Sequence, residues 1–466
     1  MKSTQVLPTK ENIYNSIQQD IIGRNKQVYY FTSMLNDVEG PYSFALNARW
    51  GEGKTFFIKQ TQMFLDACNP ISKSLSDEEK IVVKEAMQRA IGGRETITDL
   101  QPQMTIYYDA WQCDNDTDPI LSLLYEITRQ CAKCFKYDSE DGRSKLLNAL
   151  NLCASIADLI PGMNSKGVVS AIKDLTKKED PMCEIIQAKD LQGSIIDFLA
   201  TIMIEQGNRL VIFIDELDRC KPDYAVRFLE RIKHYFVIEN VTFVFSVNTQ
   251  ELQHTINRYY GDKFSATLYL TRFFDFIVDL PAAELRSFYD TLGINTMYHF
   301  DVVCQEVINY YHFSLRDLAQ YYKKCRIAAH KLTHDNASYY DKGEDYGLYA
   351  LVPIMIGLEI YDYSAYQMFV DGKDPSPLIE ILGEGEILSF LFRAMLSNDE
   401  TYDDSESGKT YVSKKQKLEE YYNAVFAQDY DKRIYVKRIG TIECNKGTKL
   451  FLLQVASGLT PYADRT

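Results

Sequence analysis

The segment Ala48–Thr55, Ala-Arg-Trp-Gly-Glu-Gly-Lys-Thr, is the feature of this 466-residue sequence that most limits its possible folds. An apolar run, Tyr42–Asn47, precedes it, and a helical pattern follows it. Gly51 and Gly53 allow a tight loop whose backbone N–H groups face inward, close to a ligand. This order of strand, glycine-containing loop, Lys-Thr pair and helix predicts a phosphate-binding loop.

The loop and the start of the following helix supply candidate contacts to the phosphate chain of a nucleotide. These nine consecutive residues are Ala48, Arg49, Trp50, Gly51, Glu52, Gly53, Lys54, Thr55 and Phe56. A helix N-terminus adds unpaired N–H groups and the positive end of its dipole, which favour an anion. We expect Lys54 to reach the β- and γ-phosphates and to act in catalysis, and the Thr55 hydroxyl to bind Mg²⁺.

A second apolar run, Leu210–Asp215, ends in two consecutive acids, Asp215 and Glu216. In phosphoryl-transfer sites one such acid holds Mg²⁺ and another polarises the attacking water. We therefore expect Asp215 to hold Mg²⁺ through water and Glu216 to be the general base. A strand that merely ends in an acidic turn is the competing interpretation, and the phosphate-binding loop on another strand makes it the weaker one.

Five apolar runs have the length and residue types of strands. They are Tyr42–Asn47, Met104–Asp109, Leu210–Asp215, Val241–Val247 and Phe276–Leu280. Nearly uninterrupted apolar runs are typical of strands buried on both faces, as in a parallel sheet. Helical segments separate them, and Pro222 is well placed to begin one of these helices. The sequence therefore predicts an α/β fold with a five-stranded parallel sheet.

The order of these elements suggests the domain organisation. Residues 1–285 contain all five predicted strands and form the expected core, with a helical insertion at about 115–206 and a charged helix within Ser72–Arg94. Strand-like runs stop at about Ala282. We expect a helical lid at 286–340, with a helix beginning within Phe313–Asp317, and a C-terminal helical domain at 341–466. The acidic stretch Ser397–Gly408 is expected to be an exposed loop.

The net charge of −14 argues against a protein that coats nucleic acid by bulk electrostatics. Two clusters of basic residues with tyrosines nevertheless occur, Tyr322–Arg326 and Lys432–Arg438, and aromatic side chains beside basic ones can stack on bases. The same spacing is more often a buried helix face beside a solvated basic face. Nucleic acid as a partner is therefore the less favoured expectation.

Several features favour a cytoplasmic location without membrane insertion. Met1–Tyr14 lacks the apolar core of a secretory signal, and no uncharged apolar run reaches the roughly 18 residues of a membrane span. The closest candidate, Leu146–Ile160, is too short and too polar. The ten cysteines have no regular spacing, which is typical of free thiols in a reducing compartment. Cys131 and Cys134 fall on one predicted helix face, so a metal or redox role is disfavoured.

At four places, in the right order, the sequence resembles the KAP family of P-loop NTPases. The matching segments are Trp50–Thr55, Tyr108–Trp111, Asp215–Cys220 and Tyr269–Phe274, and the resemblance covers roughly residues 15–285. The third segment is the most specific, because an acidic run followed by Asp-Arg-Cys is rare outside the family. Here a glutamate replaces the family's second aspartate in that segment, and Arg272 replaces a lysine in the fourth, so each position keeps its charge.

The resemblance implies the additional-strand (ASCE) class of P-loop NTPase fold and further functional residues. Asn248, after the fourth strand, would orient the attacking water in catalysis; it also fits a helix N-cap, and both roles stay open. Related NTPases form oligomers in which an arginine reaches the neighbouring site, and Arg272 and Arg219 are candidates for this role. Arg316 would act as a sensor in its own subunit. A structural ion pair is the competing role of each arginine, and Trp111 is expected to pack rather than to contact ligand.

The leading expectation is an ATPase that uses Mg²⁺ and whose turnover drives assembly or conformational switching, as a homo-oligomer. ATP is favoured over GTP because no guanine-reading Asn-Lys-x-Asp stretch occurs. The family resemblance also implies a role in exclusion of, or defence against, phages. The first alternative is a nucleotide-gated switch that hydrolyses little and acts through a separate effector protein. The second alternative is a nucleic-acid-sensing or translocating motor.

Overall fold

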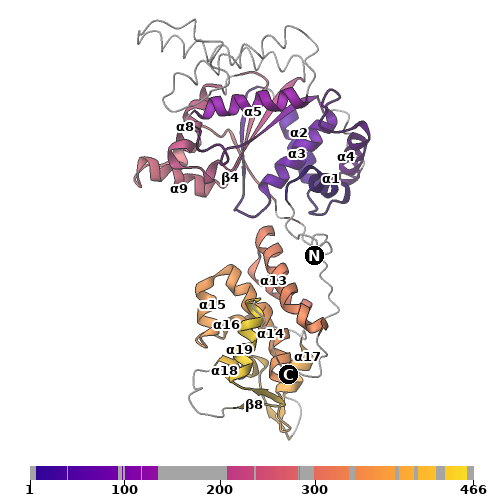
Figure 1. Cartoon of the computed structure of the whole chain (residues 1–466), viewed down its shortest axis with the longest axis vertical. Helices are drawn as coiled ribbons and strands as arrows, with labels where there is room; N and C mark the ends of the chain where they lie inside the picture. Colours follow the sequence, from indigo (N-terminus) through magenta and orange to yellow (C-terminus); the bar gives the residue numbers. More distant parts are fainter. Residues whose placement is uncertain are drawn as a thin grey trace. The chain divides into compact units, whose positions relative to one another are not determined.

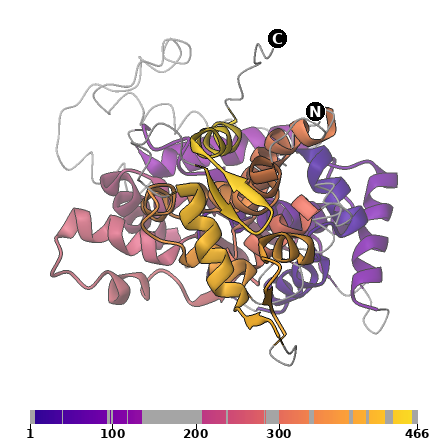
Figure 2. The same ribbon diagram turned by 90° about the horizontal axis from the view of Figure 1, so that it is seen from below.

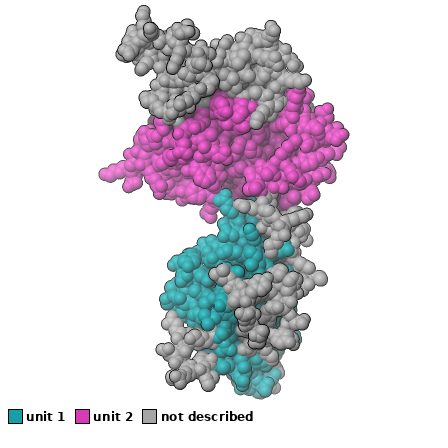
Figure 3. Space-filling model, viewed as in Figure 1, with its two compact units in different colours: residues 1–6, 288–466 teal, residues 7–287 magenta. Residues whose placement is uncertain are grey.

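The computed structural model describes residues 7–134, 207–281, 283, 299–334 and 342–458, apart from 39, 93–96, 98–99, 117, 236–237, 384–387, 404–407 and 427–435. The chain divides into two compact units, coloured separately in Figure 3. The N-terminal unit comprises residues 7–287, and the C-terminal unit comprises 288–466 with 1–6. Within the described ranges, every helix is either too short or too polar to span a bilayer.

One parallel β-sheet forms the centre of the N-terminal unit (Figure 1). Its strands are β1 (Ser43–Asn47), β2 (Gln103–Asp109), β3 (Arg209–Asp215), β4 (Val241–Val247) and β5 (Phe276–Asp279). The five predicted strands and the α/β class are therefore confirmed. The strand order β2-β3-β4-β1-β5 inserts β4 between β3 and β1, which is the additional strand that the family resemblance implied.

Helices cover both faces of this sheet. On one side α3 (Lys54–Cys68) packs on β2 and β4 and is surrounded by α1 (Lys10–Gln19), α2 (Asn25–Asp37) and α4 (Asp77–Ala90). On the other side lie α5 (Pro119–Cys134), α8 (Pro222–Ile232) and α9 (Thr249–Tyr260). Pro222 is the first residue of α8, as predicted, and α4 is the expected charged helix. Most of the expected insertion at 115–206, including Leu146–Ile160, lies outside the described residues.

The strands β3 and β4 are buried along their whole length, whereas the edge strand β5 is not. Every residue of β3 and β4 is buried, because helices cover both faces and strands flank both sides. In β5, Phe276 and Ile277 are 43% and 55% exposed. The expectation that all five strands are buried on both faces is therefore wrong for β5. The other edge strand, β2, is covered by α3 and α5, whereas the main contacts of β5 among the described residues are with β1.

The C-terminal unit is mainly helical. Its helices are α12 (His299–Tyr311), α13 (Leu315–His334), α14 (Lys342–Tyr361), α15 (Tyr363–Val370), α16 (Ser376–Leu382), α17 (Ser389–Met395), α18 (Lys414–Phe426) and α19 (Lys446–Ala456). α14 lies at the centre and contacts α12, α13, α15 and α19, which explains why it is apolar on all sides. α13 begins where predicted, and the Ser314 hydroxyl accepts a hydrogen bond from the Asp317 backbone N–H (3.3 Å).

Two small sheets correct the expectation that strands stop at about Ala282 and that the C-terminal region is wholly helical. β6 (Glu400–Thr401) pairs with β7 (Thr410–Tyr411), and β8 (Lys437–Ile439) pairs antiparallel with β9 (Ile442–Cys444), drawn as yellow arrows in Figure 2. β6 lies inside the stretch that we expected to be an exposed loop, and its Thr401 is buried. Strands this short carry too few side chains to show an alternating pattern in the sequence.

Candidate nucleotide-binding site

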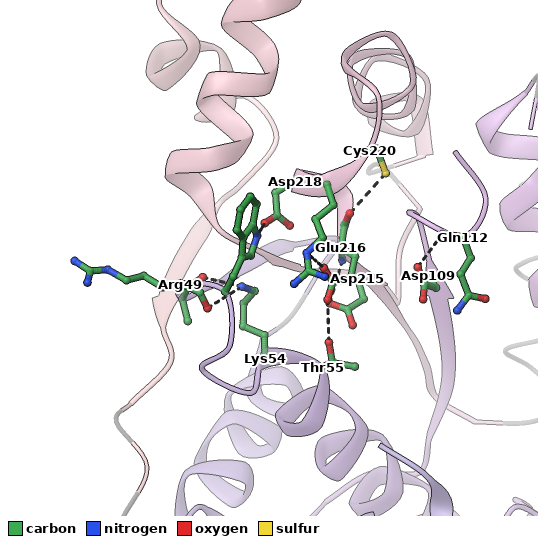
Figure 4. Close-up of polar contacts among 12 residues, drawn as sticks. Arg49, Lys54, Thr55, Asp109, Gln112, Asp215, Glu216, Asp218 and Cys220 are labelled. Atoms are coloured by element: carbon green, nitrogen blue, oxygen red, sulfur yellow. Dashed lines mark hydrogen bonds and ion pairs between the residues drawn. The ribbon is translucent and has the colours of Figure 1, made fainter. Parts of the chain in front are cut away.

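The loop between β1 and α3 closes around its own lysine. Gly51 and Gly53 have φ angles of 88° and 85°, in the left-handed region where a side chain is strained. The Lys54 Nζ donates to the carbonyl oxygens of Ala48 (2.7 Å) and Arg49 (3.3 Å), so the ammonium group lies within the loop (Figure 4). Burial lowers the pKa of Lys54, and nearby carboxylates oppose this effect. The predicted loop geometry and the position of its lysine are thus both present.

Polar residues lie side by side at the carboxyl ends of three neighbouring strands, and of these Asp215 lies opposite Thr55 at the start of α3 (Figure 4). The strand register sets Asp109 of β2 beside Asp215 of β3, and Asp215 beside Ser246 of β4. Asp215 is fully buried and accepts hydrogen bonds from the Tyr107 hydroxyl and the Glu216 backbone N–H, both at 3.0 Å. The buried Ser246 hydroxyl has no hydrogen-bond partner in the described part of the chain. The sequence analysis singled out neither Tyr107 nor Ser246, because each falls within an apolar run.

Glu216 leaves β3 in an uncommon backbone conformation, with φ 60° and ψ 24°. This conformation leads into a short 3-10 helix, η3 (Leu217–Arg219), and brings the Glu216 Oε1 to 3.5 Å from the Thr55 Oγ1 (Figure 4). Burial and the neighbouring Asp215 carboxylate raise the pKa of Glu216 to about 7, whereas Arg219 lowers it. A carboxylate with such a pKa can accept a proton near neutral pH.

These residues fit a Mg²⁺ ion that is held together with a nucleotide. Mg²⁺ usually takes one or two protein oxygens and completes its shell with water and phosphate oxygens. The Thr55 hydroxyl and the Asp215 carboxylate provide such oxygens, and the repulsion between Asp215 and Glu216 is what a cation would relieve. No group of three or more His, Cys, Asp and Glu side chains suited to a metal occurs among the residues that the structure describes. At such a site the phosphate oxygens of the nucleotide would complete the coordination of Mg²⁺.

Arg24, immediately before α2, is a site residue that the sequence analysis missed. Its side chain is 1% exposed, and it donates from Nη1 to the Glu52 carbonyl (2.9 Å) and from Nη2 to the Pro281 carbonyl (2.7 Å). Burial lowers the pKa of Arg24 to about 10, although Glu52 opposes this. These two bonds tie the phosphate-binding loop to the chain that follows β5. A single arginine ahead of a helix gives no sequence signal of contacts so distant along the chain.

Both tryptophans of the chain lie at this site. The Trp50 indole donates to the Asp218 Oδ2 (2.6 Å), and the Arg219 guanidinium is 5.5 Å from the ring centres of both Trp50 and Trp111. The Arg219 Nε lies 2.5 Å from the Glu216 Oε2. The ion-pair role of Arg219 is therefore confirmed, and its partner is the predicted base. Trp111 is 51% exposed and lies against this guanidinium, so it is not a core residue, and its packing role stays a prediction.

Asn248 follows β4 and begins α9. Its side-chain oxygen accepts hydrogen bonds from the backbone N–H groups of Gln250 (3.1 Å) and Glu251 (3.4 Å), so the N-cap role is confirmed. The side-chain amide nitrogen donates to no group in the described ranges. The water-orienting role of Asn248 stays a prediction.

The two remaining candidate arginines lie in different units. Arg272 is exposed and follows α10 (Ala266–Leu270) in the N-terminal unit. Arg316 is exposed in the first turn of α13, in the C-terminal unit. Both roles therefore remain predictions.

The basic cluster Tyr322–Arg326 lies on α13 and has two faces. Tyr322 and Cys325 are buried, and Lys324 pairs with Glu359 (2.8 Å), so the tyrosine serves the core. This arrangement agrees with a buried face beside a solvated basic face. The first part of the second cluster, Lys432–Arg438, lies outside the described residues, as do the side chains of Cys131 and Cys134. Six other cysteines are free thiols, as expected: Cys68, Cys113, Cys220, Cys304, Cys325 and Cys444.

The chain matches the profile of a known protein family. The profile of the KAP family P-loop domain matches residues 24–293, which is more than half of the chain. The matched region begins at Arg24 and includes all five strands, the phosphate-binding loop and the acids after β3. A search of curated proteins found no match. The site and this match together identify the chain as a member of the KAP family of P-loop NTPases.

Proposed function

We propose that this protein binds ATP with Mg²⁺ and hydrolyses its γ-phosphate. The observation that carries the proposal is the 3.5 Å approach of the Glu216 carboxylate to the Thr55 hydroxyl, since it joins two motifs that lie 161 residues apart. A Mg²⁺-binding hydroxyl and a general base must both lie close to the γ-phosphate in a hydrolysing site. A merely nucleotide-binding loop has no need of a carboxylate with a pKa of about 7 at this place.

Each residue then has one role. The loop N–H groups and Lys54 bind the phosphate chain, and Thr55 and Asp215 would hold Mg²⁺, which supplies positive charge to the phosphate oxygens. Glu216 accepts the proton of the attacking water, and Asn248 orients that water through its amide nitrogen. The buried surroundings of Glu216 keep its pKa near the working pH. A large fraction of the Glu216 side chains is then ionised, and the carboxylate is still basic enough to accept a proton.

The biological setting extends this proposal further. We infer that ATP turnover drives assembly or conformational switching of a homo-oligomer in the cytoplasm, in defence against phages. Membership of the KAP family supports this setting. A separate effector protein fits the same scheme, because switching by the NTPase can be passed to another protein.

A nucleotide-gated switch with little hydrolysis is the second candidate, and one observation favours it. Glu216 is bound by Arg219 at 2.5 Å, and Lys54 is bound by the carbonyl groups of its own loop. A site whose base and lysine are both engaged can bind nucleotide and change state without rapid turnover. Different affinities of a ligand for two states are sufficient for switching.

Phosphate release by the purified protein with ATP and Mg²⁺ tests the proposal. We expect activity in the wild type and its loss in Lys54→Ala and Glu216→Gln. Lys73→Ala and Glu85→Gln are the matched controls, because both positions are exposed and lie outside the site. Nucleotide binding by calorimetry accompanies the assay. Binding without phosphate release would support the switch, and absence of binding would reject both candidates.

A further inference from the structure

One arginine connects the two tryptophans of the chain with the proposed base. Trp50 comes from the phosphate-binding loop, Trp111 follows β2, and Arg219 follows β3. The Arg219 guanidinium contacts both indole rings at 5.5 Å, and both rings are partly exposed, at 43% and 51%. A guanidinium held against two indoles has a favourable electrostatic contact with each ring face. Arg219 is therefore positioned by two indoles that come from two other segments of the chain.

Two residues of the short helix η3 contact the Trp50 indole, and one of them also contacts the proposed base. Asp218 fixes the Trp50 indole by a 2.6 Å hydrogen bond, and the next residue, Arg219, contacts the same indole. The Arg219 Nε meets the Glu216 Oε2 at 2.5 Å, while the other oxygen of Glu216 is the one near Thr55. A movement of Arg219 would therefore act on Glu216 and on both tryptophans together.

The chemistry of the guanidinium identifies the ligand that would compete for it. A guanidinium binds carboxylates and phosphates alike, through parallel N–H groups. Lys54 and the loop are arranged to bring a phosphate chain beside Thr55, which is also where the Glu216 carboxylate lies. The terminal phosphate of a nucleoside triphosphate carries more negative charge than a single carboxylate. It is therefore the stronger anion for Arg219.

We propose that Arg219 is a positioning residue that detects the γ-phosphate within its own subunit. Without a γ-phosphate it holds Glu216 by the ion pair and rests on the two indoles. With a γ-phosphate it transfers to the phosphate oxygens, and Glu216 becomes free to bind the attacking water. This inference rests on the proposed nucleotide site, and it assigns Arg219 to its own subunit rather than to a neighbour.

The tryptophans allow a direct test, because the chain has only two. In Trp50→Phe the single remaining indole, Trp111, reports on Arg219 from outside the phosphate-binding loop. We expect its fluorescence to change when a non-hydrolysable triphosphate analogue of ATP binds with Mg²⁺, and to stay unchanged when ADP binds. Calorimetry on the same samples establishes that each nucleotide is bound. The double variant Trp50→Phe with Arg219→Gln should lose the triphosphate-specific change.

Affinities separate a sensing role from a merely structural one. We expect Arg219→Lys, which keeps the charge but not the planar fork, to bind ADP as the wild type does and the triphosphate analogue about tenfold more weakly. Arg227→Gln is the matched control, because it removes a surface ion pair with Asp223 on α8. Equal weakening of both nucleotides in Arg219→Lys would show a structural role and overturn the inference.

Two further outcomes have distinct meanings. A Trp111 response that is the same for both bound nucleotides, or that persists in Arg219→Gln, overturns the inference while the proposed nucleotide site stands. Absence of nucleotide binding in the wild type rejects the proposed function itself, and this inference with it.

Discussion

At the scale of single residues, the site combines unusual backbone geometry with buried charge. Glu216 lies in the left-handed region immediately after fully buried Asp215. Such conformations in residues with side chains persist only where the surrounding structure imposes them, and they concentrate at functional sites. Here the tight turn allows both acids to face α3, although consecutive residues of a strand would point to opposite faces.

The first prediction concerns the pH dependence of phosphate release. Burial and Asp215 raise the pKa of Glu216 to about 7, so the carboxylate becomes the major form only above that pH. We expect kcat to rise from about pH 6 and to level off near pH 8, because the ionised form is the base. A flat profile across this interval would show that Glu216 is not the base that limits the rate.

The raised pKa of Glu216 makes folding stability fall, rather than rise, with increasing pH. The folded-state pKa of Glu216 is raised above its usual 4.5, so between these two values the folded protein binds more protons than the unfolded chain. The contribution of Glu216 to stability is therefore present at low pH and is lost as the pH rises towards 7. Activity gained and stability lost over one pH interval is typical of a group that is tuned for function.

The second prediction concerns Arg24. Replacement by Met removes the donors of two buried carbonyl groups, at Glu52 and Pro281, and we expect it to lower the free energy of unfolding by about 1–3 kcal/mol. Nucleotide affinity should fall as well, since the loop loses its link to the chain after β5. Urea denaturation and calorimetry measure the two effects. Arg89→Met is the control, because the exposed Arg89 donates to a surface carbonyl. Unchanged stability in Arg24→Met would contradict the role of Arg24 in linking the loop to the chain after β5.

At the scale of elements, the strand order determines which residues meet. Because β4 lies between β1 and β3, the loop after β1 and the acids after β3 lie on either side of the residue that follows β4, Asn248. In a parallel sheet all carboxyl ends share one edge, and ligands bind there. The position of α3 follows from the same geometry, because its N-terminus begins directly after the loop.

The third prediction separates the two roles of Asn248. Loss of the N-cap in Asn248→Ala should lower the free energy of unfolding by about 1 kcal/mol, whereas Asn248→Ser keeps a capping oxygen. We expect the serine variant to keep wild-type stability and to release phosphate more slowly, because it lacks the amide nitrogen. Thermal unfolding and kcat measured on the same samples give the answer. Wild-type kcat in the serine variant would show that Asn248 serves only as a helix cap.

At the scale of the whole molecule, the chain is acidic and combines a P-loop NTPase unit, which carries the candidate nucleotide site, with a second, mainly helical unit. The net charge of −14 disfavours general association with nucleic acid, and the basic cluster on α13 turns its tyrosine inward. We therefore expect a partner of the C-terminal unit to be a protein rather than a nucleic acid. Weak or absent binding of single-stranded DNA at moderate salt would agree with this expectation.

The fourth prediction addresses assembly. Arg272 is exposed just after α10, so its guanidinium is open to a neighbouring subunit. We expect Arg272→Ala and Lys54→Ala to be inactive separately and to regain phosphate release when mixed, because each supplies what the other lacks. Arg227→Ala mixed with Lys54→Ala controls for nonspecific effects of mixing on the assay. A mixture that stays inactive, although both variants assemble, would assign Arg272 a role in its own subunit.

Much of the core and of the site was predictable because the determining signals are local. A glycine loop after an apolar run, a Pro at a helix start and two acids after a strand are all properties of neighbouring residues. Lys54, Thr55, Asp215 and Glu216 were found in this way, and so were the five strands. The two-residue strand β6 gave no such signal, because it covers a single alternating period and so shows no repeat.

Tertiary structure alone decided the contacts between segments that are distant along the chain. The contact of Arg24 with Pro281 spans 257 residues, and the Trp50–Asp218 bond spans 168. Nothing in the neighbourhood of either residue encodes its partner, since the partner is set by the strand order and by the packing of helices on the sheet. The sequence by itself determined which residues are candidates for the chemistry, because that depends on residue type and local geometry. Folding decided that Arg219 would pair with Glu216 and lie against two tryptophans, because only the assembled sheet brings the segments of Trp50, Trp111 and Arg219 together.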